Sequence, residues 1–209
     1  MAGTGLPNAT VIDQRGQWVK IVGSEAPAAA RKPSGGPGML AHRFVADYRV
    51  EAGECLVIFG GSHGDAQKAV IDGFLDMTDV KITAVYAKEE GVTQAEAWIR
   101  EAKLGERVRC KLGGIESLPV ADGAFDVVVG VGPMLIFADR PKAMKEIFRV
   151  LGDGGVSLVG GRFLGMPEWR KVKSETLRQD AAGTGIPSIR IIDDMGQWVE
   201  IRKGVRIAP

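Results

Sequence analysis

The chain has 209 residues, 45% hydrophobic and 25% charged, which is typical of a globular domain with a short appendage and excludes disordered, collagen-like and coiled-coil proteins. Its 27 basic and 26 acidic residues give a net charge of 27 − 26 = +1, so no overall field favours nucleic acid or an anionic membrane. The sequence has no apolar run near the roughly 20 residues that span a bilayer, and it does not begin with a secretory signal, so we expect a cytoplasmic protein.

Both ends of the chain predict a β-hairpin, in residues 1–23 and 188–203, because alternating apolar residues flank a glycine-containing turn. Residues 3–21 and 183–201 repeat each other, with identity at 11 of 19 positions. Two interpretations of this repeat stay open. Either both hairpins extend one edge of a sheet, with Trp18 and Trp198 as buried anchors, or they pair between the subunits of a homodimer.

Residues 24–38 are rich in Pro, Gly, Ala and Ser without periodicity and predict a linker. Residues 39–209 then predict a single α/β domain that includes the C-terminal hairpin. Between residues 55 and 161, short apolar β-branched runs alternate with helical patterns. Strands that are apolar on both faces and separated by helices indicate a doubly wound, mostly parallel sheet covered on both sides.

Local signals predict several element boundaries in this domain. Thr93 is a candidate helix N-cap with Glu96 three residues later, and Pro141 suits the first turn of another helix. The glycines at positions 152, 154 and 155 are expected to end that helix before a strand that begins near Val156.

The turn after the first predicted strand is the candidate ligand site. A doubly wound sheet binds ligands beyond the carboxyl ends of its strands, where the strand order reverses. Here the turn contains Gly60, Gly61, Ser62, His63 and Gly64. Glycines allow close approach of main chain to a ligand, although a tight turn also needs glycine for steric reasons alone.

Two further stretches make the pattern more specific: ESLPVADGAFDVVV at 116–129 and KAMKEIFRVLGDGG at 142–155. Together with the glycine turn, they make residues 50–161 resemble the class I S-adenosylmethionine-dependent methyltransferases. The resemblance implies a Rossmann-like sheet of order 3-2-1-4-5 closed by an antiparallel hairpin, with S-adenosylmethionine as cofactor. It implies these cofactor-binding residues: Gly60, Gly61, Ser62, His63, Gly64, Tyr86, Ala87, Ile115, Glu116 and Gly130. No metal site is expected, because the sequence has only two histidines and two cysteines and no grouping of carboxylates.

Three acidic or glycine positions of the family motif are replaced in this chain. Ile58 stands where an acid opens the glycine motif, Ser62 where its second glycine lies, and Tyr86 where an acid binds both ribose hydroxyls. Gly114 occupies a further acidic position after the third strand, with Glu116 nearby. A hydrogen bond to a charged group contributes about 1.5–3 kcal/mol, so loss of the ribose acid weakens binding by roughly tenfold to a hundredfold.

The cysteines, His42 and two further stretches of the chain are expected to have structural roles. Cys55 and Cys110 fall on strands separated by a third, roughly 10 Å apart and beyond disulfide reach. His42 is expected to lie on an amphipathic helix as an ordinary residue; the alternative is a role where methyltransferases close over substrate. Residues 133–137 are all apolar and predict either core or an apolar substrate pocket. The basic residues at 162, 170, 171 and 173 predict a solvated helical face, not a nucleic-acid site.

Two functions compete. The first is methyl transfer to a small molecule, which needs mainly alignment and for which no catalytic base is assigned. The second is a noncatalytic binding or assembly protein of the same fold that has lost or changed its cofactor site. A nicotinamide-dependent dehydrogenase fits poorly because the glycine spacing departs from G-x-G-x-x-G.

Overall fold

The computed structural model describes residues 9–11, 19–21, 38–131, 135, 138–162, 172–192 and 197–204. Internal contacts divide the chain into two units, Met1–Pro33 and Ser34–Pro209. The predicted linker lies outside the described residues except for Gly38, which begins the first helix. None of the helices that the structure describes is both long and apolar enough to cross a membrane.

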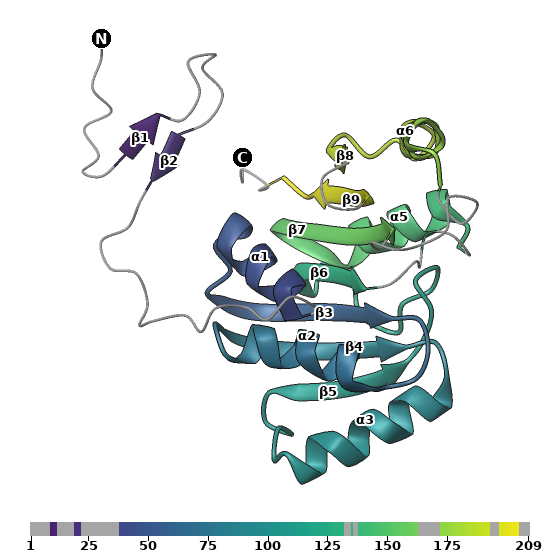
Figure 1. Cartoon of the computed structure of the whole chain (residues 1–209). Coiled ribbons are helices and arrows are strands. Elements are labelled where there is room, and N and C mark those ends of the chain that lie inside the picture. Colours follow the sequence, from purple (N-terminus) through teal and green to yellow (C-terminus); the bar gives the residue numbers. More distant parts are fainter. Residues whose placement is uncertain are drawn as a thin grey trace. The chain divides into compact units, whose positions relative to one another are not determined.

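The larger unit is built on a seven-stranded sheet of order β5-β4-β3-β6-β7-β9-β8 (Figure 1). Pairing is parallel from β5 to β7 and antiparallel where β9 joins β7 and β8. This arrangement confirms the predicted order 3-2-1-4-5 with a closing antiparallel hairpin. The strands are β3 (Ala52–Phe59), β4 (Asp79–Tyr86), β5 (Val108–Leu112), β6 (Phe125–Val131), β7 (Leu151–Arg162), β8 (Ile189–Ile192) and β9 (Gln197–Arg202).

Helices cover both faces of this sheet, as the apolar pattern predicts. Residues of α1, α2 and α3 share one buried cluster, and those of α5 and α6 share the other. Alternate residues of β3 enter opposite clusters, since Phe59 belongs to the first and Ile58 to the second. The helices are α1 (Gly38–Tyr48), α2 (Asp65–Leu75), α3 (Glu89–Glu101), α5 (Arg140–Val150) and α6 (Ser174–Ala182).

Two predicted boundaries are wrong and one is confirmed. Helix α3 begins at Glu89, a turn before Thr93, because Glu89 and Glu90 place acidic side chains at its positive end. Strand β7 begins at Leu151, not near Val156, because its glycine-rich start pairs with β6 through a register shift. Pro141 does lie in the first turn of α5, after the N-cap Asp139.

The two sequence repeats form hairpins with the same strand register. In the smaller unit, β1 (Ala9–Val11) pairs antiparallel with β2 (Val19–Ile21), and Ala9 faces Ile21. In the sheet, Ile189 of β8 faces Ile201 of β9, which are the positions exactly matched by the repeat. The β1–β2 pair is a two-stranded sheet of its own. The turns of both hairpins and Trp18 lie outside the described residues.

A buried carboxylate ties α1 to the edge of the sheet. Glu200 of β9 is 4% exposed and accepts hydrogen bonds from the Tyr48 hydroxyl, from Arg190 at 3.0 Å and from Arg202 at 3.1 Å. Burial alone would raise the pKa of Glu200, but the hydrogen bonds from Arg202 and Tyr48 outweigh burial, so its pKa lies below the ordinary value. Burial and the same carboxylate raise the pKa of Tyr48.

We expect Glu200→Gln to lower the free energy of unfolding by about 1–3 kcal/mol at neutral pH, because both arginines lose their anionic partner. The folded-state pKa is lowered, so the contribution of Glu200 is complete above the ordinary value of 4.5 and is lost as pH falls below it. Denaturant unfolding at several pH values tests this expectation. Glu101→Gln, at an exposed position, is the control; an equal loss in both variants would contradict the assigned role.

Candidate functional site

The candidate site lies where the carboxyl ends of three parallel strands meet. Phe59, the last residue of β3, is in register with Tyr86 of β4 on one side and with Val131 of β6 on the other. The glycine loop, which we define as Gly60–Gly64, leaves β3 at this point and leads into α2. The strand order reverses here, so the loop occupies the switch point of the sheet (Figure 1).

Main chain is open to approach at the first two residues of the loop. Among the residues that the structure describes, a Cβ atom placed on Gly60 or Gly61 would meet no heavy atom within 4 Å. Gly60 is exposed and Gly61 half-buried. Packing within the described protein therefore does not require glycine at either position. This open space is where a ligand can contact the loop backbone.

The opposite side of the loop packs tightly against α3. A Cβ on Gly91, in the first turn of α3, would lie 2.3 Å from the carbonyl oxygen of Gly61 and 2.8 Å from Cδ1 of Tyr86. Only glycine permits this approach between helix and loop. The loop therefore rests on α3 and β4 and presents its other side outward.

The side chains of His63 and Tyr86 meet beneath the loop. Their Nδ1 and hydroxyl atoms share a hydrogen bond of 2.6 Å, and the Tyr86 side chain is fully buried. Burial, and to a lesser extent Cys110, raises the pKa of Tyr86, while burial and then Lys68 lower the pKa of His63. Tyr86 thus points into the core and pairs with the loop, and it does not present its hydroxyl to the open side.

The loop between β5 and β6 brings Ile115 and Glu116 to the same edge of the sheet. Ile115 is 6% exposed and belongs to the core cluster shared with α5. An oxygen of Glu116 accepts a hydrogen bond of 2.7 Å from the backbone N–H of Asp139, which caps α5. This oxygen is therefore occupied in holding the start of α5.

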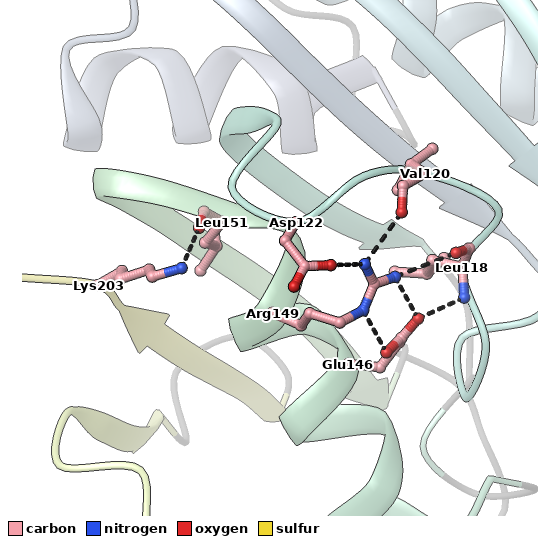
Figure 2. Close-up of polar contacts among 7 residues, drawn as sticks. All are labelled: Leu118, Val120, Asp122, Glu146, Arg149, Leu151 and Lys203. Atoms are coloured by element: carbon pink, nitrogen blue, oxygen red, sulfur yellow. Dashed lines mark hydrogen bonds and ion pairs between the residues drawn. The ribbon is translucent and has the colours of Figure 1, made fainter.

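Figure 2 shows how Arg149 of α5 holds that same loop. Its guanidinium donates to the carbonyls of Leu118 at 3.1 Å and Val120 at 3.0 Å, and it also bonds the carboxylate of Asp122. Glu146 binds the guanidinium at 2.6 Å and accepts from the Leu118 N–H at 2.7 Å. One arginine side chain therefore provides hydrogen-bond donors to two carbonyl groups of this loop, which has little regular structure.

Charges in this network reinforce each other. The hydrogen bond from Arg149 is the main cause that holds the pKa of Glu146 below its ordinary value, against the effect of burial. The hydrogen bond to Glu146 likewise raises the pKa of Arg149. Both groups stay ionised at neutral pH. Their bonds to Leu118 and Val120 hold the loop that carries Ile115 and Glu116 against α5.

The remaining residues implied by the resemblance lie around this edge in different roles. Ser62 and Ala87 are exposed. Gly64 is the N-cap of α2, and its N–H donates to the Gln67 side chain at 3.1 Å. Gly130 is buried in β6, where a Cβ would lie 2.6 Å from a methyl of Val159, so packing between strands requires this glycine.

The other singled-out residues fall away from the loop or outside the described residues. Cys55 and Cys110 are free thiols on β3 and β5, with β4 between them, which confirms that no disulfide joins them. Leu135 is fully buried; its neighbours at 133–134 and 136–137 lie outside the described residues, as do the His42 side chain and most of the basic stretch. Across the described ranges, no cluster of three His, Cys, Asp or Glu side chains could hold a metal ion.

Comparison with known proteins identifies the domain. A family model for a methyltransferase domain matches residues 66–159. The 27-O-demethylrifamycin SV methyltransferase of Amycolatopsis mediterranei is 26% identical over 145 residues, which are 69% of this chain and 52% of that protein. The mitochondrial 2-methoxy-6-polyprenyl-1,4-benzoquinol methylase of Leishmania donovani is 36% identical over 124 residues, 58% of this chain and 37% of that one. The chain thus spans about half or less of the length of these relatives.

Solved structures share the fold. An S-adenosyl-L-methionine-dependent methyltransferase assigned in Methanococcus maripaludis aligns with a TM-score of 0.67 and 23% identity, covering 82% of this chain and 87% of that one. The [4+2]-cyclase SpnF aligns with a TM-score of 0.59 and 24% identity over 75% of this chain and 58% of its own.

A sheet of this order, with its ligand loop after the central strand, is that of the class I methyltransferases. The family-model match and the relatives agree with the sheet. Residues 66–159 therefore match a methyltransferase domain, which agrees with the resemblance of the sequence to the class I S-adenosylmethionine-dependent methyltransferases.

The family cofactor, S-adenosylmethionine, fits one part of the described site and not another. The open main chain at Gly60 and Gly61 fits the close approach of an adenosyl group. The position expected to bind ribose does not fit in the usual way, because Tyr86 is buried and bonded to His63. Ile58, at the other replaced acid, is also fully buried in the core. The described edge of the sheet therefore offers open main chain at Gly60 and Gly61 and no carboxylate at positions 58 and 86.

Sequence reasoning missed three residues that shape this site: Gly91, Gln94 and Arg149. The Gln94 side chain accepts a hydrogen bond of 3.0 Å from the His63 N–H and so joins α3 to the glycine loop. Gly91, a glycine in the first turn of a helix, was the one feature of the sequence that could have indicated the close approach of α3 to the glycine loop. Arg149 lies inside the family-like stretch at 142–155, but nothing in its spacing indicates that its side chain bonds four residues.

We expect Arg149→Met to lower the free energy of unfolding by about 2–4 kcal/mol, because Glu146 and two loop carbonyls lose their donor. Denaturant unfolding at neutral pH measures this change. Arg100→Met, at an exposed position on α3, is the matched control and should change stability by about 0.5 kcal/mol or less. Similar small effects in both variants would contradict the assigned role of Arg149.

Proposed function

We propose that this chain transfers a methyl group from S-adenosylmethionine to a small molecule. The observation that carries the proposal is the open main chain at Gly60 and Gly61, at the switch point of a methyltransferase fold. When bound, the cofactor supplies a methyl group activated by attachment to a sulfonium. The task of the protein is then to align an acceptor with that methyl, for which no catalytic base is necessary unless the acceptor carries a proton.

Backbone and apolar surface supply the proposed cofactor contacts. The loop at Gly60–Gly61 would lie against the adenosyl group, and the exposed backbone at Ala87 and the apolar side chain of Ile115 would border it. Glu116 would contribute through the carboxylate oxygen that does not hold Asp139. Without a carboxylate for the ribose hydroxyls, we expect affinity roughly tenfold to a hundredfold weaker than with that acid present.

The names of the two relatives support a small acceptor. One is named for a rifamycin and the other for a polyprenyl benzoquinol. Both matches cover only part of each relative, so the identity of the acceptor does not transfer with them. We propose a small molecule as the acceptor class for this chain and leave its identity to substrate screening.

A noncatalytic role is the second candidate, and a specific observation favours it. Ile58 and Tyr86, which replace the two acids of the cofactor motif, are both fully buried and serve the core. The fold also carries other chemistry, since a protein named as a [4+2]-cyclase shares it. In this alternative the chain keeps the scaffold and binds S-adenosylmethionine feebly or not at all.

Calorimetric titration with S-adenosylmethionine and S-adenosylhomocysteine separates the two functions. We expect micromolar binding, and we expect Gly60→Leu to weaken it at least about tenfold by filling the open space beside the loop. Gly105→Leu is the matched control, because Gly105 is also exposed with no neighbour within 4 Å but lies between α3 and β5. No heat at millimolar ligand would favour the noncatalytic role.

We further propose that the repeated hairpins hold a homodimer together. The support is the shared register of β1–β2 and β8–β9, which gives the N-terminal hairpin the pairing pattern of a sheet-edge element. Deletion of residues 1–23 should then lower the mass measured by light scattering to that of a monomer. An unchanged mass would remove the intersubunit interpretation.

A further inference from the structure

His63 joins the glycine loop to helix α3 and to strand β4. Its backbone N–H donates to Gln94 of α3 at 3.0 Å, and Gln94 in turn donates to Glu90 at 3.0 Å. Its ring lies 5.1 Å from the ring of Trp98 and 5.7 Å from that of Tyr86, measured between centroids. One loop residue is therefore held at both its backbone and its side chain.

One ring nitrogen of His63 has no partner. Nδ1 shares the hydrogen bond with the Tyr86 hydroxyl, while Nε2 is buried and makes no hydrogen bond within the part of the chain that the structure describes. A neutral imidazole has one N–H and one lone pair, so a single hydrogen bond leaves one of them unsatisfied. An imidazolium would leave a buried N–H and a charge unsatisfied, which costs more.

The charged surroundings of His63 also favour the neutral ring. Lys68 of α2 is a cation whose charge opposes protonation. On α3, Gln94 lies between His63 and the carboxylate of Glu90. The titratable and charged groups around the His63–Tyr86 pair are Asp65 and Lys68 on α2, Glu90 and Glu96 on α3, and Cys110 on β5.

We propose that His63 and Tyr86 are positioning residues for the cofactor, which hold Gly60 and Gly61 in place while the ring of His63 is neutral and release them when it is protonated. The inference rests on the proposed function, because the ligand of the loop is the cofactor. It goes beyond that function by assigning the loop geometry to a buried pair. It also replaces the direct ligand role that the resemblance implies for Tyr86.

The geometry explains why the pair acts on the loop and not only on the core. Gly61 contacts Gly91 through its carbonyl oxygen, so the loop cannot move further toward α3. Movement in the opposite direction carries the loop into the open space, and the bonds from His63 to Tyr86 and Gln94 oppose it. Loss of the Tyr86 bond thus frees the loop on the side where the ligand approaches.

The pH dependence follows with a definite sign. Burial lowers the pKa of His63 in the folded protein below its ordinary value of 6.5. The unfolded chain and the released loop then bind more protons than the intact pair as pH falls below 6.5. Cofactor affinity and protection of the loop should therefore both be complete above that pH and decline below it.

The test uses the full chain and two readouts. The first is the affinity for S-adenosylmethionine by calorimetry between pH 5.5 and 8, and the second is amide hydrogen exchange of Gly60 and Gly61 without ligand, corrected for the intrinsic exchange rate. We expect Tyr86→Phe to weaken binding about tenfold, the size of one lost hydrogen bond, and to speed exchange at both glycines. Tyr48→Phe removes a half-buried, hydrogen-bonded hydroxyl from the Glu200 site and is the matched control.

A conservative variant separates positioning from general stability. His63→Asn keeps a polar atom near Nδ1 but cannot be protonated, so it should retain affinity at pH 8 and abolish the decline below pH 6.5. His63→Ala should bind weakly at every pH. A decline that persists in His63→Asn, or unchanged exchange in Tyr86→Phe, would overturn the inference. If no variant or wild type binds the cofactor, the exchange data still decide the inference while the proposed function fails.

Discussion

The core of this protein extends to the last residue of its central strands, and the site is shaped by that constraint. Ile58, Phe59 and Tyr86 are all fully buried at the point where β3 and β4 end. A buried strand end leaves no room for an ionised carboxylate, whose desolvation would be costly without a charged partner. What the sheet can offer a ligand here is the main chain of the loop that follows.

This constraint also explains why the loop depends on distant parts of the chain. A loop without side-chain anchors to its ligand needs its own backbone held in place beforehand. Gln94 and Gly91 of α3 and Tyr86 of β4 contact the loop on one side, two of them through His63. On the neighbouring side, Arg149 fixes the loop that carries Ile115 (Figure 2). The two supports come from helices on opposite faces of the sheet.

The parallel sheet could be predicted from the sequence because strands buried on both faces leave a continuous apolar signal, whereas the strand order was implied by the family resemblance. The contacts that shape the site could not be predicted. His63 and Tyr86 are 23 residues apart, and whether a residue at a strand end faces the core or the ligand depends on packing that the local pattern does not encode. Thr93 failed as a cap for a similar reason, since the acidic turn before it extends α3.

The identical register of the two hairpins has a consequence for how the sheet is completed. Among the described residues, β1 and β2 form a two-stranded sheet, and β8–β9 adopts the same pairing beside β7. The alignment of β9 with β8 is therefore encoded within the repeated segment itself. Hairpins assemble in about 1–10 μs, well before most long-range contacts. Strands β8 and β9 can thus pair with each other first and then dock against β7 as one hairpin. Completing the sheet then requires one docking event and not two.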